Sequence, residues 1–477
     1  MLFTEPTFLF AFLPVLLALY FLPGHGHRNV LLLAFSVVFY ASGGGAFTWL
    51  ILASIAVNYG AALAIDAARG TPAARRLLVL AVGLNLLSLV TFKYAGFLAE
   101  NVNALLRPLG AAVPVPAIVL PIGISFFTFH AISYVVDVYR RDAVAQKGPV
   151  EAALYLLLFP QLIAGPIVRY RDIATQLSAR LVTSDDLALG IRRFVIGLGK
   201  KTLVANIVAV PADRLFGLPP GELTMTSAWL AVVCYTLQIY FDFSGYSDMA
   251  IGLARMFGFR FRENFDYPYV ARSVQEFWRR WHMSLSAWFR DYVYVPLGGS
   301  RVPPHRIYMN LVTVFFLCGL WHGASWTFVA WGLFHGAFLV LERAGLDARL
   351  DRAWRPLRHG YTLAVVMVGW VFFRAESLPA ALGVLRALAG GSPALPTPYT
   401  VWWYLTPEVV AALAAGIIGA MPVWRAVAAW FEQPVPGGPR LGALASALSV
   451  AALAAIFGGC VMLIAAHTYN PFIYFRF

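Results

Sequence analysis

A histidine at the end of an apolar run is the residue of this chain best placed to do chemistry. His322 lies in the segment Gly319–Gly323 (GLWHG), which closes an apolar stretch that begins at about Leu311 and contains no other acidic or basic residue. Burial disfavours the charged form of an imidazole, so such a side chain stays neutral. A neutral imidazole is what a general base for a hydroxyl group requires. The alternative is a histidine that packs between helices and bonds to a backbone carbonyl.

The same pattern returns thirteen residues later, with His335 in the segment Gly332–Gly336 (GLFHG), again within an apolar run. On an unbroken helix this spacing would turn His335 about 220° away from His322. We therefore predict that His335 serves packing or assembly rather than chemistry.

A third histidine stands in the densest group of polar and aromatic residues. His282 lies in Glu276–Ser286 (EFWRRWHMSLS), which follows Asn264–Tyr269 (NFDYPY) and continues to Gly299. As one helix, this block would place an aromatic and apolar set on one face and its arginines elsewhere: Trp278, Trp281, His282, Leu285 and Phe289 against Arg279, Arg280 and Arg290. The block is too polar and too short to span a bilayer. It predicts an amphipathic or re-entrant helix whose aromatic face lines a cavity and whose arginines meet phosphates or headgroups. An ordinary interfacial helix would not explain His282.

Two aspartates follow an apolar run in the segment Gln238–Asp248. Carboxylates in such surroundings must be paired, solvated or protonated. We expect Asp242 and Asp248 to bond to nearby backbone or to pair with an arginine of segment 272–290. No histidine or glutamate cluster stands nearby in sequence, so no metal site is expected. The three cysteines lie in apolar runs without paired spacing, and we expect buried free thiols at Cys234, Cys318 and Cys460.

The elements that must position these residues are membrane helices. The chain has 477 residues, of which 60% are hydrophobic and 12% charged, and the apolar residues form long runs. We predict an all-α polytopic membrane protein with about ten to twelve crossings. The first run, Phe8–Leu22, has no basic residue before it and no small-residue cleavage site after it, so we expect a retained helix. We expect one integral membrane domain with N-terminal helices over 1–110, a catalytic core over 115–340 and C-terminal helices over 341–477.

One segment of the core cannot be a plain spanning helix. Within Phe159–Ile167, Pro160 and Pro166 bracket Gln161 and Gly165. Proline removes a helical hydrogen bond, and broken backbone at membrane depth is tolerated where protein buries it or where it lines a wet cavity. The segment therefore predicts a re-entrant stretch.

The formal net charge of +13 does not indicate nucleic-acid binding, because the basic residues sit in short loops between apolar runs. Arg69–Arg76 and Arg140–Lys147 are such loops, whereas the intervening loops carry only Arg107. This alternation is typical of the positive-inside rule. It places the basic loops in the cytoplasm and the N-terminus on the extracytoplasmic side.

Taken together, these blocks resemble the membrane-bound O-acyltransferases, in particular the bacterial branch that contains the membrane subunit of alginate O-acetylation. The resemblance covers roughly residues 1–380 and is carried by six segments: Pro121–Tyr139, Phe159–Pro166, Gln238–Asp248, Glu276–Ser286, Asp291–Gly299 and Gly319–Gly336. It implies about eleven helices, with re-entrant segments, around a thin partition and a cytoplasmic funnel for the acyl donor. It also implies catalytic roles for His322 and His282. His130 departs from the branch, which has glutamine there, and we assign it no catalytic role.

The implied function is O-acetylation in a bacterial inner (cytoplasmic) membrane. An acetyl group would pass from acetyl-CoA or another cytoplasmic acyl thioester to an extracytoplasmic polysaccharide such as alginate, with an extracytoplasmic acetyltransferase as partner protein and lipid around the chain. No bound cofactor is expected. His322 would act as base or carry the acyl group transiently, and His282 or the groups around Ser284 would stabilise the oxyanion. The residues expected to contact substrate are Trp278, Arg279, Arg280, Trp281, Ser284, Trp288, Tyr294, Trp321 and Trp326.

Other classes of function stay open at this point. The nearest is transfer of a D-alanyl group from a carrier protein to a cell-wall polymer, which the predicted orientation and the arginine- and alanine-rich composition favour less than acetylation. A transporter would also have broken helices and buried ionisable residues, but it should show matching interrupted helices in two halves. The sequence shows no such symmetry.

Overall fold

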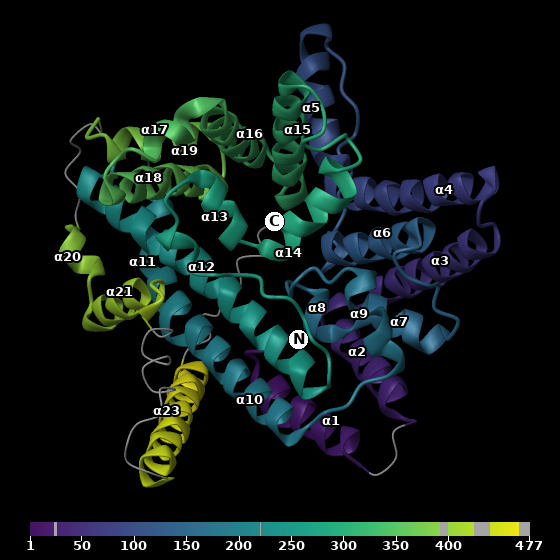
Figure 1. Ribbon diagram of the computed structural model, residues 1–477. Coiled ribbons are helices and arrows are strands. Elements are labelled where there is room, and N and C mark those ends of the chain that lie inside the picture. The colour runs from purple at the N-terminus through teal and green to yellow at the C-terminus, as the bar shows by residue number, and fades with distance from the viewer. Residues whose placement is uncertain (23–25, 220, 392–398, 424–438, 467–477) are drawn as a thin grey trace. The chain divides into compact units, whose positions relative to one another are not determined.

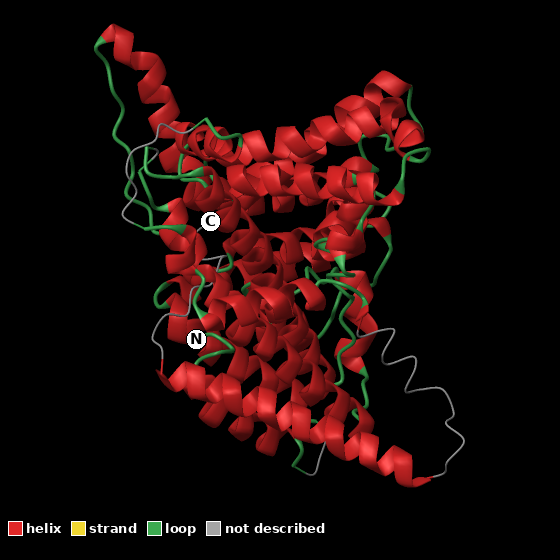
Figure 2. Cartoon of the chain, turned by 90° about the vertical axis from the view of Figure 1, so that its left-hand side faces the viewer, coloured by secondary structure: helices red, strands yellow, loops and turns green. Residues whose placement is uncertain are grey.

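The computed structural model describes residues 1–22, 26–219, 221–391, 399–423 and 439–466. Every regular element in these ranges is a helix (Figure 2). Two compact units are present: unit 1 comprises Met1–Phe194 and Met249–Arg262, and unit 2 comprises Val195–Asp248 and Glu263–Phe477. The predicted all-α class is confirmed.

Unit 1 holds the N-terminal helices, and α10 begins in it. Its elements, of which Figure 1 labels the α-helices, are η1 (Phe8–Phe12), α1 (Leu13–Tyr20), α2 (Arg28–Gly44), α3 (Phe47–Ala67), α4 (Pro72–Leu89), η2 (Val90–Tyr94), α5 (Ala95–Leu106), η3 (Arg107–Leu109), α6 (Ile124–Arg140), α7 (Pro149–Leu157), α8 (Phe159–Leu162), α9 (Tyr170–Ser178) and α10 (Ser184–Gly199).

Unit 2 holds the elements that carry the candidate site. They are η4 (Lys200–Ala205), α11 (Asn206–Phe216), α12 (Met225–Met256), η5 (Pro268–Val270), α13 (Val274–Arg280), α14 (Met283–Phe289), η6 (Arg290–Tyr294), α15 (Pro304–His322), α16 (Trp326–Leu341), η7 (Glu342–Leu346), α17 (Asp347–Leu350), α18 (Arg355–Arg374), α19 (Leu378–Leu388), α20 (Val401–Tyr404), α21 (Pro407–Gly419) and α23 (Pro439–Ala466). The last turns of α12 belong to unit 1.

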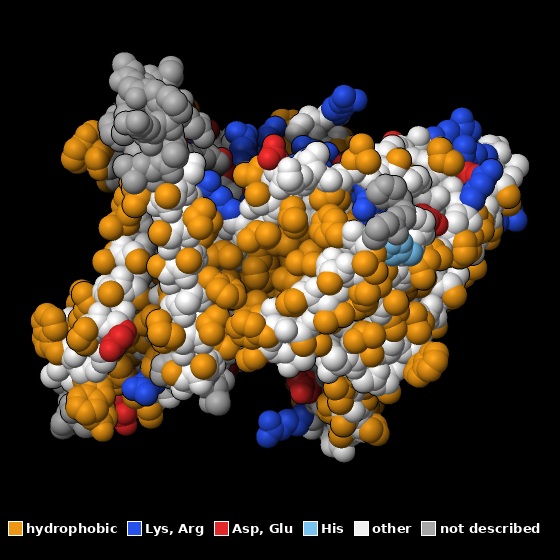
Figure 3. Space-filling view, turned by 90° about the horizontal axis from the view of Figure 1, so that it is seen from below, with side chains coloured by type: hydrophobic (Ala, Val, Ile, Leu, Met, Phe, Trp, Pro, Cys, Tyr) orange, Lys and Arg blue, Asp and Glu red, His pale blue; other side chains and the backbone are white. Residues whose placement is uncertain are grey.

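The described helices include four that are long and apolar enough to cross a membrane: Phe47–Ala67, Pro72–Leu109, Ser184–Phe216 and Ser446–Ala466. Four shorter apolar helices accompany them: Phe8–Tyr20, Arg28–Gly44, Leu378–Leu388 and Pro407–Gly419. Hydrophobic side chains cover much of the surface seen in Figure 3, and lysines and arginines gather near its margins. Such a surface suits a lipid environment. The predicted number of crossings stays a prediction.

The predicted break in segment 159–167 is present in unit 1. α7 ends at Leu157, the single-turn α8 follows, and irregular backbone leads to Arg169. The whole stretch is buried, as broken backbone requires when no water is at hand. Gly165 is needed because a Cβ there would meet the carbonyl oxygen of Pro160 and would lie 2.6 Å from Cα of Gln161.

Both aspartates of α12 are paired, as expected, but the predicted arginine partners are wrong. Lys201 lies 2.5 Å from Asp242, with both side chains almost fully buried, and Lys200 lies 2.6 Å from Asp248. The two lysines belong to the π-helix η4. A Cβ on Gly245 of α12 would lie 3.0 Å from the backbone nitrogen of Lys201, so glycine lets the two helices approach closely enough for the ion pairs to form.

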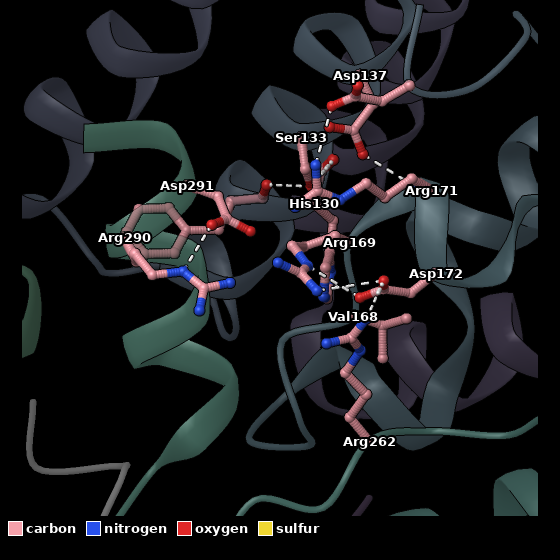
Figure 4. Close-up of polar contacts among 12 residues, drawn as sticks. His130, Ser133, Asp137, Val168, Arg169, Arg171, Asp172, Arg262, Arg290 and Asp291 are labelled. Carbon is pink, nitrogen blue, oxygen red and sulfur yellow. Dashed lines mark hydrogen bonds and ion pairs between the residues drawn. The ribbon is translucent and has the colours of Figure 1, made fainter. Parts of the chain in front are cut away.

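Unit 1 has its own buried polar cluster, drawn in Figure 4. Asp137 accepts the backbone N–H of Arg171 at 3.0 Å, and Arg169 pairs with Asp172 at 2.9 Å. Asp172 also pairs with Arg262 at 2.8 Å. These contacts connect the end of α6 to the start of α9 and to the irregular segment that follows α12. They give Asp137, Arg169 and Asp172 structural partners.

Candidate active site

The block around His282 is two short helices rather than the single helix that its periodicity predicted. α13 ends at Arg280, Trp281 is extended, and His282 takes a left-handed conformation (φ 45°, ψ 52°) before α14 begins at Met283. This conformation is costly for any residue with a Cβ, by about 1–3 kcal/mol, and it persists where the surroundings impose it. The shared helical face of the prediction is therefore wrong beyond Trp281.

Asn264 supplies the contacts that impose this turn. Its backbone oxygen accepts the N–H of Met283 at 2.9 Å. Its side-chain oxygen accepts the N–H and the hydroxyl of Ser284, at 3.2 and 2.8 Å, and lies 3.1 Å from Nδ1 of His282. Asn264 therefore caps α14 from eighteen residues before His282 in the sequence, and it also anchors the imidazole. The phenyl ring of Phe243 in α12 packs edge-on against that imidazole at 4.6 Å.

His322 is the last residue of α15, as the apolar run predicted, and is 5% exposed. Its ring packs edge-on against Trp331 and Phe373, with centroids 5.1 Å away in both cases. The centroid of the His282 ring lies 6.5 Å from that of His322. The fold thus brings together two histidines forty residues apart, close enough to contact one small reacting group.

Glycines of the two echoed motifs explain how His322 is held. A Cβ on Gly319 of α15 would meet the carbonyl oxygen of Phe328, and one on Gly332 of α16 would meet that of Phe315. A Cβ on Gly319 would also lie only 3.3 Å from Cα of Gly332. The backbones of α15 and α16 therefore touch, as small residues allow in membrane helix pairs.

His335 lies in the middle of α16 and is fully buried. α15 ends at His322 and α16 starts at Trp326, so the unbroken helix assumed for the 220° rotation does not exist. The His335 ring packs against Trp278 at 5.1 Å and against Trp331 at 5.3 Å. Gly369 lies directly against its Nε2, leaving no room for a Cβ. These contacts support a packing role.

Four of the predicted substrate residues lie near the histidine pair or in its aromatic wall. Trp321 packs against both histidines, with centroids 6.2 Å from His282 and 4.9 Å from His322. Ser284 bonds to the same asparagine oxygen as His282. Trp278 reaches the site through Trp331, whose ring is 5.6 Å away. Trp281 lies in a neighbouring group of rings that reaches Trp331 through Trp370, with centroids 6.3 Å apart: Tyr240, Phe265, Tyr269, Phe277 and Trp370.

The remaining three predicted aromatic residues have other surroundings. Trp326 is 54% exposed in the first turn of α16. Trp288 packs against Tyr292 at 5.1 Å, and the Tyr294 hydroxyl bonds to that of Ser300 at 3.0 Å. The assignment of these three residues to substrate stays a prediction, as it does for the other residues of the set.

Arg279 and Arg280 line a polar cavity of about 510 Å³. Its lining residues come from α13 and its flanks, α17 and α18: Asp266, Arg272, Ser273, Gln275, Glu276, Arg279, Arg280, Asp347, Asp351 and Arg358. Arg280 is held by Glu276 at 2.9 Å and by Asp266 at 3.2 Å, whereas Arg279 is exposed. Burial raises the pKa of Glu276, but the backbone N–H of Arg272 and the Arg280 guanidinium outweigh it, and the pKa lies below its usual value.

Glu342 was not identified from the sequence, although it holds α13 in place. The side chain is 3% exposed, and its two oxygens accept the backbone N–H groups of Val274 and Gln275 at 2.7 and 2.9 Å. A carboxylate at a helix N-terminus accepts hydrogen bonds from the unpaired backbone N–H groups there, and its negative charge interacts favourably with the helix dipole. The signal in sequence was a lone glutamate at the end of the apolar α16. Asn264 was also missed as a site residue, although it begins the polar block before α13.

The family model for MBOAT, the membrane-bound O-acyltransferase family, matches residues 116–373. The chain belongs to the membrane-bound O-acyltransferase family. That range contains both histidines, Asn264 and Glu342. The family prediction and the prediction of an acyltransferase are therefore confirmed.

Relatives match most or all of the chain. It is 41% identical over 504 aligned residues to the probable alginate O-acetylase AlgI of Azotobacter vinelandii, with all of both chains covered. It is 46% identical to the protein of the same name in Pseudomonas aeruginosa, over 81% of this chain and 75% of the relative. It is 37% identical to the peptidoglycan O-acetyltransferase of Helicobacter pylori, over 82% of this chain and 80% of the relative.

Proposed function

We propose that this acyltransferase passes acetyl groups from a cytoplasmic thioester across the bacterial inner membrane for O-acetylation of an extracytoplasmic polysaccharide. The observation that carries the proposal is the buried pair His282 and His322, set in an aromatic site within the matched family region. The relatives named alginate O-acetylase support acetyl over D-alanyl transfer, and alginate is the first polymer to test. D-alanyl transfer from a carrier protein is the second candidate within the same chemistry.

The acyl donor in this proposal is a diffusing substrate, acetyl-CoA or another acyl thioester, and not a bound cofactor. The acceptor oxygen forms a bond to the acyl carbon, the carbon–sulfur bond breaks, and the proton of the acceptor hydroxyl ends on the thiol. His322 acts on this step as base or as a transient acyl carrier. The arginines of the α13 cavity would attract the phosphates of the donor. An extracytoplasmic acetyltransferase would make the final transfer to the polymer.

The test compares polymer acetate in cells that carry the wild-type chain or His322→Ala at matched membrane levels. The variant should insert normally and leave the polymer without acetate. Inside-out vesicles from the same cells, supplied with acetyl-CoA, should release free thiol only with the wild-type chain. Normal acetate content with His322→Ala would overturn the catalytic assignment. Thiol release with a D-alanyl carrier thioester and none with acetyl-CoA would favour the second candidate.

The orientation in this proposal has the N-terminus outside and the Arg69–Arg76 loop in the cytoplasm. A cysteine near Arg75, in a background without Cys234, Cys318 and Cys460, should react with an impermeant thiol reagent only after permeabilisation. A cysteine near Gly44 should react in intact cells. The reverse labelling pattern would place the Arg69–Arg76 loop outside the cell and would contradict the outward direction of acyl transfer.

A further inference from the structure

The side chain of Asn264 is fixed in orientation by a donor that cannot change its role. The backbone N–H of Ser284 faces the side-chain oxygen of Asn264 at 3.2 Å. A backbone N–H can only donate, so the opposite orientation of the amide would set two donors against each other. The Ser284 hydroxyl donates a second hydrogen bond to the same oxygen at 2.8 Å. The atom that faces His282 is therefore an acceptor.

This orientation determines the tautomer of His282. Nδ1 lies 3.1 Å from the Asn264 oxygen, which has no proton to give, so Nδ1 must carry the hydrogen. A neutral imidazole carries one N–H, which leaves the lone pair on Nε2. Nε2 is buried and has no hydrogen-bond partner among the described residues. A buried acceptor without a partner costs free energy, and a substrate proton is the partner that a reaction site would supply.

The turn at His282 directs its ring to the site and not to its own helix. Serine, threonine, aspartate or asparagine at this position would cap the helix with its own side chain. Here Asn264 caps α14, the His282 side chain makes no cap bond, and the backbone takes the left-handed conformation. Phe243 of α12, Trp321 and His322 of α15, and Asn264 surround the ring, and His322 is the titratable group among these four.

We propose that Asn264 is a positioning residue that holds His282 as the Nδ1–H tautomer, so that Nε2 is a proton acceptor in the acyl-transfer site. This inference rests on the proposed acetyl transfer. During that transfer the acceptor O–H bond breaks, the new C–O bond forms, the C–S bond breaks, and the proton moves from oxygen to sulfur. A nitrogen that is unprotonated at the start can relay this proton, and Nε2 of His282, in the ring beside His322, is such a nitrogen. Neutral His282 then has no N–H left to donate to the acyl carbonyl, the role that the sequence had suggested for it.

The experiment measures thiol release from acetyl-CoA in inside-out vesicles as a function of pH for the wild type, Asn264→Asp and Asn264→Ala. Aspartate keeps an acceptor for Nδ1–H and adds a charge that favours the imidazolium, so the acidic limb of the rate profile should move up by about one to three pH units. Alanine frees the ring, and kcat should fall about a hundredfold with little change in KM, because acid–base contributions are of that order. Asn310→Ala is the matched control, because Asn310 is a buried asparagine of α15 whose amide donates to the backbone carbonyls of Leu297 and Gly299. It should lower stability and leave the pH profile unchanged.

A second pair of variants keeps the test decisive if the asparagine variants fold poorly. His282→Gln offers a hydrogen-bond acceptor or donor but takes no proton at neutral pH, so it should be as inactive as His282→Ala. Clear activity in His282→Gln above that of His282→Ala would overturn the proposal in favour of a donor role. An unshifted profile in well-folded Asn264→Asp, or wild-type kcat in Asn264→Ala, would overturn it as well. If wild-type vesicles release no more thiol than His322→Ala, it is the proposed function that fails.

Discussion

His322 and His335 occupy the same place in two nearly identical motifs, yet the fold gives them different surroundings. His322 ends α15, and its ring faces His282 across 6.5 Å. His335 sits in the middle of α16, with Trp278 and Trp331 against its ring and Gly369 against its Nε2. Both rings are buried, but the surroundings of His322 include a second histidine, whereas the described contacts of His335 are with aromatic rings and a glycine. Local sequence therefore marks both histidines as candidates for chemistry, and the end of α15 at His322 distinguishes them.

The largest effect should separate the two histidines by rate. His322→Gln should lose about 10²–10⁴-fold in initial rate, because an amide cannot take a proton at neutral pH. His335→Gln should keep most of the rate per folded molecule. Thiol release from acetyl-CoA at matched protein levels measures both. An active His322→Gln beside an inactive, well-folded His335→Gln would mean that the wrong member of the pair has been assigned to catalysis.

Stability should distinguish His322 from His335 in the opposite order, with the larger loss at His335. His335→Ala leaves a cavity beside Trp278 and Trp331, which should lower the free energy of unfolding by about 2–5 kcal/mol. His322→Ala should cost less, because its ring lies at the end of α15. Thermal unfolding of the purified variants in one detergent gives the ranking. Equal losses would show that the two rings contribute equally to packing, and the contrast drawn above would be wrong.

The glycine contact between α15 and α16 tests how the two motifs are held together. Gly332→Ala forces a methyl group against the carbonyl oxygen of Phe315, so it should cost about 1–3 kcal/mol and displace His322 enough to lower the rate. Gly458→Ala in α23 is the matched control, since a Cβ there meets nothing within 4 Å. The control should be neutral or slightly stabilising, by at most about 1 kcal/mol. Similar losses in both variants would mean that the contact between α15 and α16 does not account for the loss in Gly332→Ala.

Some of this site could be predicted from the sequence, because local signals carry it. An apolar run that stops at His322 marks both the helix and its end, and paired prolines mark the broken segment around Gln161. The class of protein followed from composition, and the family from the order of the motifs. Each of these depends on residues that are neighbours in the chain.

The parts that the sequence could not supply depend on distant partners. The aromatic periodicity runs unbroken through His282, and only the contacts of Asn264 reveal the left-handed turn there. Lys200 and Lys201 pair with the aspartates of α12 from the π-helix η4, and the local sequence pattern does not predict a π-helix there. In the same way, nothing near α13 shows that Glu342 caps it from the end of α16.

Removal of the Glu342 cap should have a smaller effect on stability and rate, which α13 transmits to His335 and His282. Glu342→Ala leaves the N–H groups of Val274 and Gln275 without their acceptor, which should cost about 1–3 kcal/mol. The rate should fall too, because α13 carries Trp278 against His335 and leads directly to His282. Glu342→Gln retains one acceptor oxygen and should fall between wild type and alanine in unfolding temperature. A Gln variant less stable than the Ala variant would contradict the cap.

The smallest effect belongs to Arg279, which is adjacent to Trp278 in sequence but lines the charged cavity and not the aromatic wall. Arg280 beside it is held by two carboxylates, whereas Arg279 forms no ion pair within the described residues. An exposed guanidinium that meets a donor phosphate contributes about 0.2–1 kcal/mol. Arg279→Gln should therefore raise the KM for acetyl-CoA about two- to fivefold at low salt and leave kcat unchanged. Screening should remove the difference at high salt, and Arg349→Gln, an exposed arginine outside the cavity lining, should show no difference at either salt. A fall in kcat with KM unchanged would instead connect Arg279 to the histidine site. The charged cavity and the aromatic wall on either side of α13 would then act together in catalysis.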